Sequence, residues 1–302
     1  FHDLTTLTSF GFRGEALSSL CALCETVTVT TATVDKAPMG AVLELDKRGE
    51  PKSRGKGVRQ RGTTVLLVSP FAPLPVRRKE LERNIKREFG KALTLLNAYA
   101  LGPCCGLAVR LSVTNQPEKG YTTHISLPLS TSNGSTPSLR TVRAGTTALW
   151  GSKALDGVID LELEFDANDE DEVEETFKIS VQGLISSPTP TPGSGSTPRP
   201  GTAGRTATDR QFFYVNGRPC TMNKIQKAIN ETYRSFLPSN STSGQFPFII
   251  IDFSIPGDAV DVNVTPDKRT ILVHAEAELC TRMKVGQQIF EERNLNFIPG
   301  CP

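Results

Sequence analysis

Apolar residues recur at helical spacing in two segments of the first hundred residues. The first segment is short and predicts a helix over residues 14–24. The second predicts a long amphipathic helix from about Arg77 to Gly102, because the prolines just before it oppose an earlier start. The apolar stripe of this longer helix consists of Leu81, Ile85, Phe89, Ala92, Leu96 and Ala100.

Alternation of apolar and polar residues is typical of strands and recurs around these two helices. One intervening segment, residues 47–62, is basic and rich in glycine, and it predicts a hairpin or a mobile loop. The strands predicted in the first half lie at residues 27–29, 41–45, 63–68 and 107–113.

The second half repeats this mixture of elements after a polar, irregular stretch at residues 115–138. Residues 187–208 are rich in Pro, Ser, Thr and Gly and are expected to be disordered. Helices are predicted within 140–156 and at 225–236 and 275–292, and strands at 158–165, 177–185, 211–215 and 247–255.

This order of elements predicts an α+β fold with two domains, residues 1–136 and residues 137–302. The length of 302 residues and an apolar content of 37% suit two globular domains. Because the chain begins at Phe1 rather than Met, we expect either processing or a piece of a longer protein. No apolar run approaches the roughly 20 residues of a membrane span, so no membrane association is expected.

The seven cysteines show no framework spacing, which favours a reducing compartment and structural thiols over a metal site. Net charge is only +2, but its distribution is uneven. Basic residues gather at 47–61 and 77–87, and acidic residues gather at 166–175. Such separation is typical of a protein that binds a polyanion on one face, although ordinary solvated surface explains it equally well.

Two motifs have the composition of a nucleotide site. The first, GFRGEAL, places two glycines directly before a helix, where backbone N–H groups and the helix dipole favour phosphate. The second, RGTTV, puts a glycine and two threonines at the start of a strand. The alternatives are a plain loop-to-helix junction and an ordinary strand start. The candidate ATP-binding residues are Gly11, Phe12, Arg13, Gly14, Glu15, Ala16, Leu17, Gly62, Thr63 and Thr64.

Two further motifs carry cations at the ends of predicted strands. In DVNVTPDKR, Lys268 follows a strand and a proline turn, and could deliver its ammonium group to a phosphate. In TDRQFFYVNGRPC, a turn at residues 216–217 would expose Arg218 beside Arg205 and Arg210, where DNA phosphates could be bound. The alternative for each residue is a solvated surface cation.

Taken in order along the chain, GFRGEAL, RGTTV followed by LPVRRKEL, TDRQFFYVNGRPC and VDVNVTPDKR resemble the MutL family of DNA mismatch-repair proteins. The last two strings most resemble its eukaryotic post-meiotic-segregation (PMS) branch. The resemblance implies the C-terminal part of a GHKL (Bergerat-type) ATP-binding domain, followed by a ribosomal-protein-S5-like transducer domain.

Several roles are implied by this resemblance. GFRGEAL matches the lid that wraps the nucleotide phosphates, RGTTV matches the back of the pocket, and Lys268 matches the catalytic lysine that reaches the γ-phosphate. Arg218 matches a position implicated in DNA binding. The implied cofactors are ATP and Mg²⁺, and the implied partners are DNA, a second MutL-type subunit and a MutS-type mismatch-recognition complex, in the nucleus.

The chain also departs from the family pattern. It begins after the helix that carries the general-base Glu and the Mg-binding Asn, so we expect ATP hydrolysis by the full-length parent and not by this chain alone. The segment 187–208 is longer and richer in proline than the corresponding loop of the family. Two rival functions remain: another GHKL machine, such as a type II topoisomerase ATPase subunit, and a non-catalytic DNA-binding scaffold.

Overall fold

The structure is a computed structural model that describes residues 15–105, 109–117, 119–128, 138–168, 176–187, 205–237, 245–262, 264–265, 269–274 and 276–284. Contacts divide the chain into two compact units, Leu7–Ala92 and Leu93–Pro302 together with Phe1–Thr6. This division falls inside a long helix, whereas the sequence predicts a domain boundary between residues 136 and 137. The predicted boundary stays a prediction.

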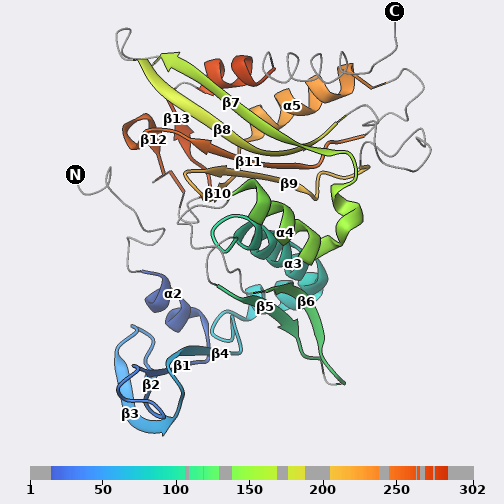
Figure 1. Cartoon of the computed structure of the whole chain (residues 1–302). Coiled ribbons are helices and arrows are strands. Elements are labelled where there is room, and N and C mark those ends of the chain that lie inside the picture. Colours follow the sequence, from blue (N-terminus) through green and yellow to red (C-terminus); the bar gives the residue numbers. More distant parts are fainter. Residues whose placement is uncertain are drawn as a thin grey trace, which may run out of the picture. The chain divides into compact units, whose positions relative to one another are not determined.

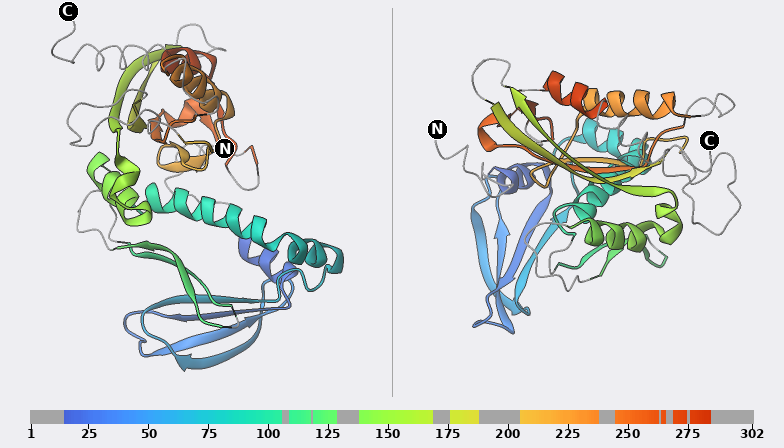
Figure 2. Two further views of the ribbon diagram at one scale, coloured as in Figure 1. Left: turned by 90° about the vertical axis from the view of Figure 1, so that its right-hand side faces the viewer. Right: turned by 45° about the horizontal axis from the view of Figure 1, so that its top comes forward.

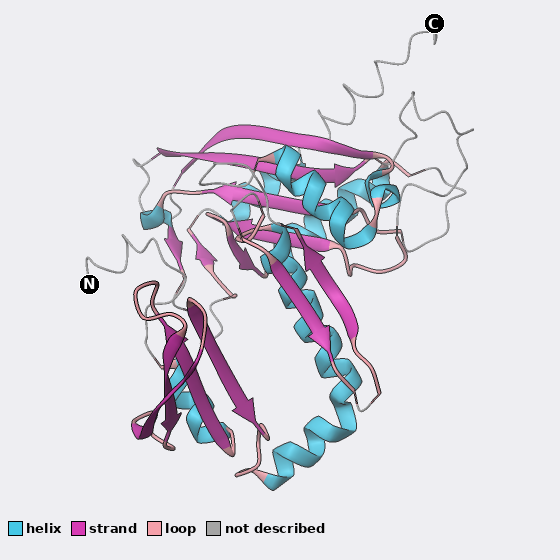
Figure 3. Cartoon of the chain, turned by 60° about the horizontal axis from the view of Figure 1, so that its bottom comes forward, coloured by secondary structure: helices cyan, strands magenta, loops and turns pink. Residues whose placement is uncertain are grey.

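The unit Leu7–Ala92 is built on an antiparallel sheet with the strand order β3-β2-β1-β4, which Figure 3 shows together with its helices. Residues 47–62, expected as a hairpin or a mobile loop, contain β3, which pairs with β2 as a hairpin. Cys21 and Cys24 of helix α2 pack on Val27 of the sheet. The elements are α2 (Ala16–Leu23), β1 (Thr26–Ala32), β2 (Met39–Leu45), β3 (Pro51–Val58) and β4 (Gly62–Val68).

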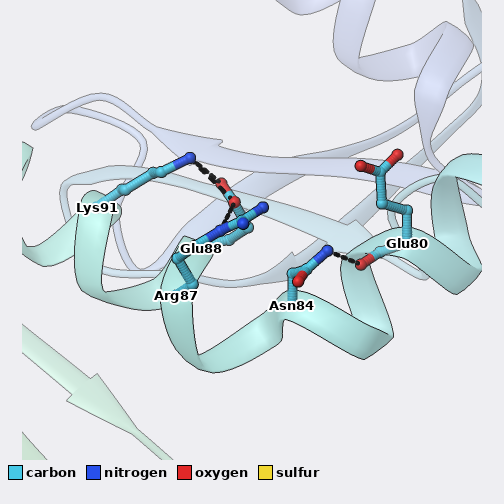
Figure 4. A network of polar contacts seen from close by, with 5 residues as sticks. All are labelled: Glu80, Asn84, Arg87, Glu88 and Lys91. Carbon is cyan, nitrogen blue, oxygen red and sulfur yellow. Dashed lines mark hydrogen bonds and ion pairs between the residues drawn. The ribbon is translucent and has the colours of Figure 1, made fainter.

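Helix α3 (Pro75–Leu101) begins two residues earlier than the sequence predicts. Proline is tolerated in the first turn of a helix, where its missing N–H has no intrahelical partner, so Pro75 starts the helix instead of blocking it. The exposed face of α3 carries short-range polar pairs (Figure 4): Glu88 accepts from Arg87 and Lys91, both at 3.0 Å. Such exposed pairs contribute little to the stability of the helix.

The unit Leu93–Pro302 is built on a five-stranded sheet with the order β10-β9-β11-β8-β7 (Figure 1). All neighbouring strands are antiparallel except β9 and β11, which run parallel and are separated in sequence by helix α5. The main elements are α4 (Leu139–Trp150), β7 (Val158–Asn168), β8 (Thr176–Ser186), β9 (Gln211–Val215), β10 (Arg218–Cys220), α5 (Asn223–Ser235) and β11 (Ile249–Ser254).

Helices cover both faces of this sheet, as Figure 2 also shows. Ile225 and Ile229 of α5 join one core, and Leu101 of α3 and Val142 of α4 join the other. Strands β9 and β11 contribute side chains to both cores, which is why their sequences are nearly continuous apolar runs rather than alternating ones.

The α+β prediction is confirmed, and most predicted elements are present. A hairpin of β5 (Leu111–Asn115) and β6 (Thr122–Leu127) corrects the prediction in one place, because β6 lies inside the stretch expected to be irregular. The predicted disordered segment 187–208 lies outside the described residues except at its two ends. Of the predicted helix 275–292, residues 276–284 are described and are helical.

Short elements complete the fold. Two 3-10 helices, η1 (Ser152–Leu155) and η2 (Gly257–Ala259), precede strands β7 and β12. The predicted strand at the start of DVNVTPDKR is reduced to β12 (Val260–Asp261), which pairs with β13 (Leu272–Val273).

Candidate functional site

A tight turn joins β9 to β10 and places Arg218 opposite Val215 in the antiparallel register. Its two central residues, Asn216 and Gly217, have φ angles of 51° and 73°. Two-residue hairpin loops with both residues in the left-handed region strongly favour the Asn-Gly sequence, so the local sequence dictates this turn. The turn that the sequence predicts at residues 216–217 is therefore the tip of a β-hairpin.

The turn is anchored to the end of β11. The Asn216 side chain donates to the Ile255 carbonyl at 2.8 Å and accepts from the Ile255 N–H at 3.0 Å. The Asn216 N–H donates to the Phe253 carbonyl at 2.9 Å. The Gly217 N–H donates to the Asp252 carboxylate at 3.1 Å. These four hydrogen bonds fix the backbone from which Arg218 projects.

Arg218 is half-buried, not fully exposed as a simple hairpin position would suggest. Burial lowers the pKa of its guanidinium group, while Tyr99 and Cys220 act in the opposite direction. An arginine remains protonated in proteins, so the side chain provides a fixed cation. Burial also raises the pKa of the neighbouring Asp252, against the backbone hydrogen bonds from Gly217 and Phe253 that lower it.

Arg205 and Arg210 lie near each other but at the other end of β9 from Arg218. Arg210 places its guanidinium 4.7 Å from the centroid of the Trp150 ring, and Arg205 pairs with Asp209 at 2.8 Å. Five residues of extended strand separate the two ends by about 16 Å. The structure thus brings two of the three predicted DNA-binding residues together and leaves Arg218 apart from them.

Lys268 lies outside the described residues, but its neighbour Arg269 does not. The Arg269 carbonyl accepts a hydrogen bond from the Thr221 N–H at 2.8 Å, directly after β10. Burial raises the pKa of the Cys220 thiol to about 12, and Arg269 and Arg218 both act to lower it. Two motifs that are fifty residues apart in sequence therefore meet around β10. No sequence signal marked Arg269 or Asp252 as part of this site.

Only the last three residues of GFRGEAL are described, since Gly11, Phe12, Arg13 and Gly14 lie outside. Glu15, Ala16 and Leu17 are exposed at the start of α2. Glu15 is the N-cap residue and makes no side-chain cap hydrogen bond. The first N–H groups of a helix have no intrahelical partner, so this terminus offers donors to an anion.

The threonines of RGTTV lie at the first residues of β4. Thr63 and Thr64 are exposed, and the Thr63 hydroxyl lies 2.8 Å from that of Thr31 on the neighbouring strand. Gly62 has a φ of 130°, which favours glycine. Helix α2 instead packs on Leu67 and Leu45, near the other end of the sheet. Thr63 and Thr64 thus lie at one end of the sheet, and the residues that α2 packs on lie near the other end.

Two features are absent from the described residues. Among them, no group of three or more His, Cys, Asp or Glu side chains could hold a metal ion. No helix within the described ranges is long and apolar enough to cross a membrane.

Comparisons with known proteins agree on one family. Residues 151–289 match the family model described as "DNA mismatch repair protein, C-terminal domain". The chain is 36% identical to human mismatch repair endonuclease PMS2 over 286 residues, and 36% identical to Arabidopsis thaliana DNA mismatch repair protein PMS1 over 299 residues. These matches cover 95% and 99% of the chain.

A solved structure extends the likeness to the fold. The crystal structure of the N-terminal domain of a DNA repair protein superposes with a TM-score of 0.78 at 33% identity, covering 96% of this chain and 78% of that one. The chain spans only 31% and 28% of the length of the human and Arabidopsis relatives.

Proposed function

The chain belongs to the MutL family of DNA mismatch-repair proteins, and its relatives include PMS1 and PMS2 proteins. From this premise we propose that it is the part of an ATP-driven clamp that binds nucleotide and DNA. In this proposal ATP binding and DNA binding are coupled within one chain. The observation that carries it is the meeting of two cation-bearing segments at β10, one with Arg218 and one leading from Lys268.

The nucleotide part of the proposal assigns the phosphates of ATP to the start of α2. The exposed N–H groups after Glu15 fit an anion. Gly11 to Gly14 would extend this cradle. Gly62, Thr63 and Thr64, at the other end of β4, would line a part of the pocket away from the start of α2. Mg²⁺ fits the described residues poorly, because they hold no suitable ligand cluster. We therefore assign no step to a metal.

Lys268 is proposed to contact the γ-phosphate and to report its presence to the DNA-binding hairpin. Support comes from the hydrogen bond between Arg269 and Thr221, which ties the segment after Lys268 to the end of β10. A change at Lys268 would thus reach the strand that begins with Arg218. Hydrolysis of ATP would weaken this contact and release the clamp.

The DNA part of the proposal centres on Arg218, with Arg210 and Arg205 as a separate, more distant contact. A guanidinium on a rigid turn loses little conformational entropy on contacting a phosphate, and phosphate contacts carry no sequence preference. The packing of Arg210 on Trp150 and the pairing of Arg205 with Asp209 favour a smaller contribution from those two residues.

The proposed partners are a second MutL-type subunit and a MutS-type mismatch-recognition complex, and the proposed location is the nucleus. Support comes from the eukaryotic mismatch-repair relatives. A type II topoisomerase-like ATPase is disfavoured because the human and Arabidopsis relatives, each 36% identical to the chain, are mismatch-repair proteins. A non-catalytic DNA-binding scaffold is the other alternative, and ATP hydrolysis by the full-length protein would exclude it.

The test is ATP hydrolysis by the full-length protein, followed as phosphate release, with Lys268→Ala against the wild type. We expect turnover to fall by at least about tenfold, the effect of losing roughly 1.4 kcal/mol of transition-state stabilisation. Lys153→Ala is the matched control, because Lys153 is exposed on η1. Wild-type turnover by Lys268→Ala would remove the lysine from the mechanism, and no turnover by the wild type would favour the scaffold.

A further inference from the structure

Strand β3 forms one edge of the four-stranded sheet and carries cations at alternate positions, Lys52, Arg54 and Lys56. All three side chains are exposed. Arg54 and Lys56 project from the same face, as residues two apart on a strand do. Lys52 continues this row along the strand but lies at the register shift opposite Glu44 and Leu45, where the alternation of faces is interrupted.

The residues that lie in register with Arg54 and Lys56 on the other three strands are uncharged. Lys56 lies in register with Ala41, Thr31 and Thr63, and Arg54 lies in register with Leu43, Val29 and Val65. None of these neighbours carries a carboxylate. For Arg54 and Lys56 no ion pair is found among the described residues, so their charge is directed to solvent.

Two of the carboxylates near β3, Glu44 and Asp46, are already engaged, and the exposed Glu50 directly precedes the strand. Glu44 pairs with Lys52 at 3.4 Å and with the Ser53 hydroxyl at 3.4 Å. Asp46 accepts the N–H groups of Arg48 and Glu50, at 2.8 and 2.9 Å, and these hydrogen bonds lower its pKa. Local pairing therefore neutralises one end of the row and leaves Arg54 and Lys56 as its cationic part.

The remaining positions of β3 are small. Ser53, Gly55 and Gly57 alternate with the cations, and a Cβ at Gly55 would meet nothing within 4 Å. Because these side chains are small, an extended polymer can approach the backbone of β3 closely. Among the described residues the outer edge of β3 has no partner strand, so about half of its N–H groups point outward as donors.

Cations on an edge strand can also serve only to prevent edge-to-edge association. The other edge of the same sheet argues against that explanation. Strand β4 carries Val65 and Leu66, which are 47% and 55% exposed, and no charged residue. Of the two outer strands of the sheet as described, only β3 thus carries cations within the strand itself.

We propose that the Arg54–Lys56 segment of β3 is a contact surface for the phosphate backbone of duplex DNA, separate from the Arg218 hairpin. The two Cα atoms lie about 6.7 Å apart, close to the axial rise of two phosphates on one DNA strand. The contact is independent of sequence, because β3 offers charge and backbone donors but no side chain suited to base edges. It does not require the ATP-coupled function proposed above.

The test is binding of a mixed-sequence duplex to the whole chain at several salt concentrations. Arg54→Glu/Lys56→Glu should make the slope of log affinity against log salt shallower by about two units and weaken binding on the order of tenfold at about 0.1 M salt. The matched control is Arg140→Glu/Lys153→Glu, which reverses two exposed charges on α4 and η1 and should leave both quantities near wild type. Melting temperatures should agree within about 2 °C for both variants.

Each outcome decides the proposal. Wild-type slope and affinity in Arg54→Glu/Lys56→Glu overturn it, as does an equal loss in the control. Self-association of Arg54→Gln/Lys56→Gln with unchanged DNA binding shows edge protection instead. Competition by polyglutamate as strong as competition by duplex would favour an acidic protein partner and also overturn it. Arg218→Gln, measured in parallel, reports separately on the DNA site of the proposed function.

Discussion

The hydroxyl of Tyr214 in β9 donates a 2.7 Å hydrogen bond to the carbonyl oxygen of Ala98 in α3. Tyr214 is fully buried, and its ring packs directly against Gly102 just after the helix. This contact joins the last turn of α3 to the central strands of the sheet. Since β9 leads into the hairpin that carries Arg218, the structural anchor and the candidate DNA contact lie on two paired strands, β9 and β10.

Tyr214→Phe should lower the free energy of unfolding by about 1 kcal/mol, the usual value of one buried hydrogen bond. A larger loss is not expected, because the Ala98 carbonyl also accepts from the Gly102 N–H at 3.1 Å. Urea unfolding of the two proteins measures the difference. Tyr121→Phe is the control, since Tyr121 is 75% exposed. Equal stability of Tyr214→Phe and the wild type would show that the anchor contributes nothing.

Gly102→Ala should destabilise the protein by about 1–3 kcal/mol, because a Cβ there would lie 2.2 Å from Cε1 of Tyr214. Gly90→Ala, inside helix α3, meets no atom within 4 Å and should instead be neutral or stabilising by up to about 1 kcal/mol. Thermal unfolding of the Gly102→Ala and Gly90→Ala variants separates the effect of packing against Tyr214 from the effect of helix propensity. Similar effects at the two positions would contradict the packing described.

Asp252→Asn should change how stability depends on pH. Burial raises the pKa of the Asp252 carboxyl above its ordinary value of 3.8. A raised folded-state pKa means that the native state binds the proton more tightly than the unfolded state. The stabilising effect of the protonated group is therefore complete below 3.8 and is lost as pH rises through the folded-state pKa.

The asparagine variant keeps an oxygen acceptor for the Gly217 N–H and removes this titration. Its stability relative to the wild type should increase from acidic to neutral pH, as followed by urea unfolding at each pH. A difference that stays constant across that range would mean that the carboxyl of Asp252 is not perturbed in the way its burial implies.

Much of the site could be predicted where local sequence dictates local structure. Asn216-Gly217 specifies its own turn, and the apolar runs of β9 and β11 reflect burial on both faces. The role of Asp252 could not be predicted, because its carboxylate meets Gly217 from 35 residues away. The strand β6 was missed because polar threonines begin it and only two of its residues are buried. The sequence predicts Arg210 as a phosphate-binding or solvated cation, but its position over the Trp150 ring depends on tertiary packing.

The proposed function depends most directly on contact between the Arg218 hairpin and DNA phosphates. Because Arg218 is half-buried, reversal of its charge would also disturb packing, so we choose Arg218→Gln, with Arg218→Lys as the variant that retains the charge. Arg140→Gln controls for the loss of one exposed cation. Melting of each variant is followed in parallel to confirm that the fold is retained.

The decisive measurement is the salt dependence of duplex binding by these variants on several unrelated sequences. We expect Arg218→Gln to weaken binding to all sequences alike and to make the slope of log affinity against log salt shallower by about 0.9. Arg218→Lys should restore this slope, and Arg140→Gln should leave it unchanged. A folded Arg218→Gln protein with the wild-type slope and affinity would show that Arg218 does not contact DNA phosphates.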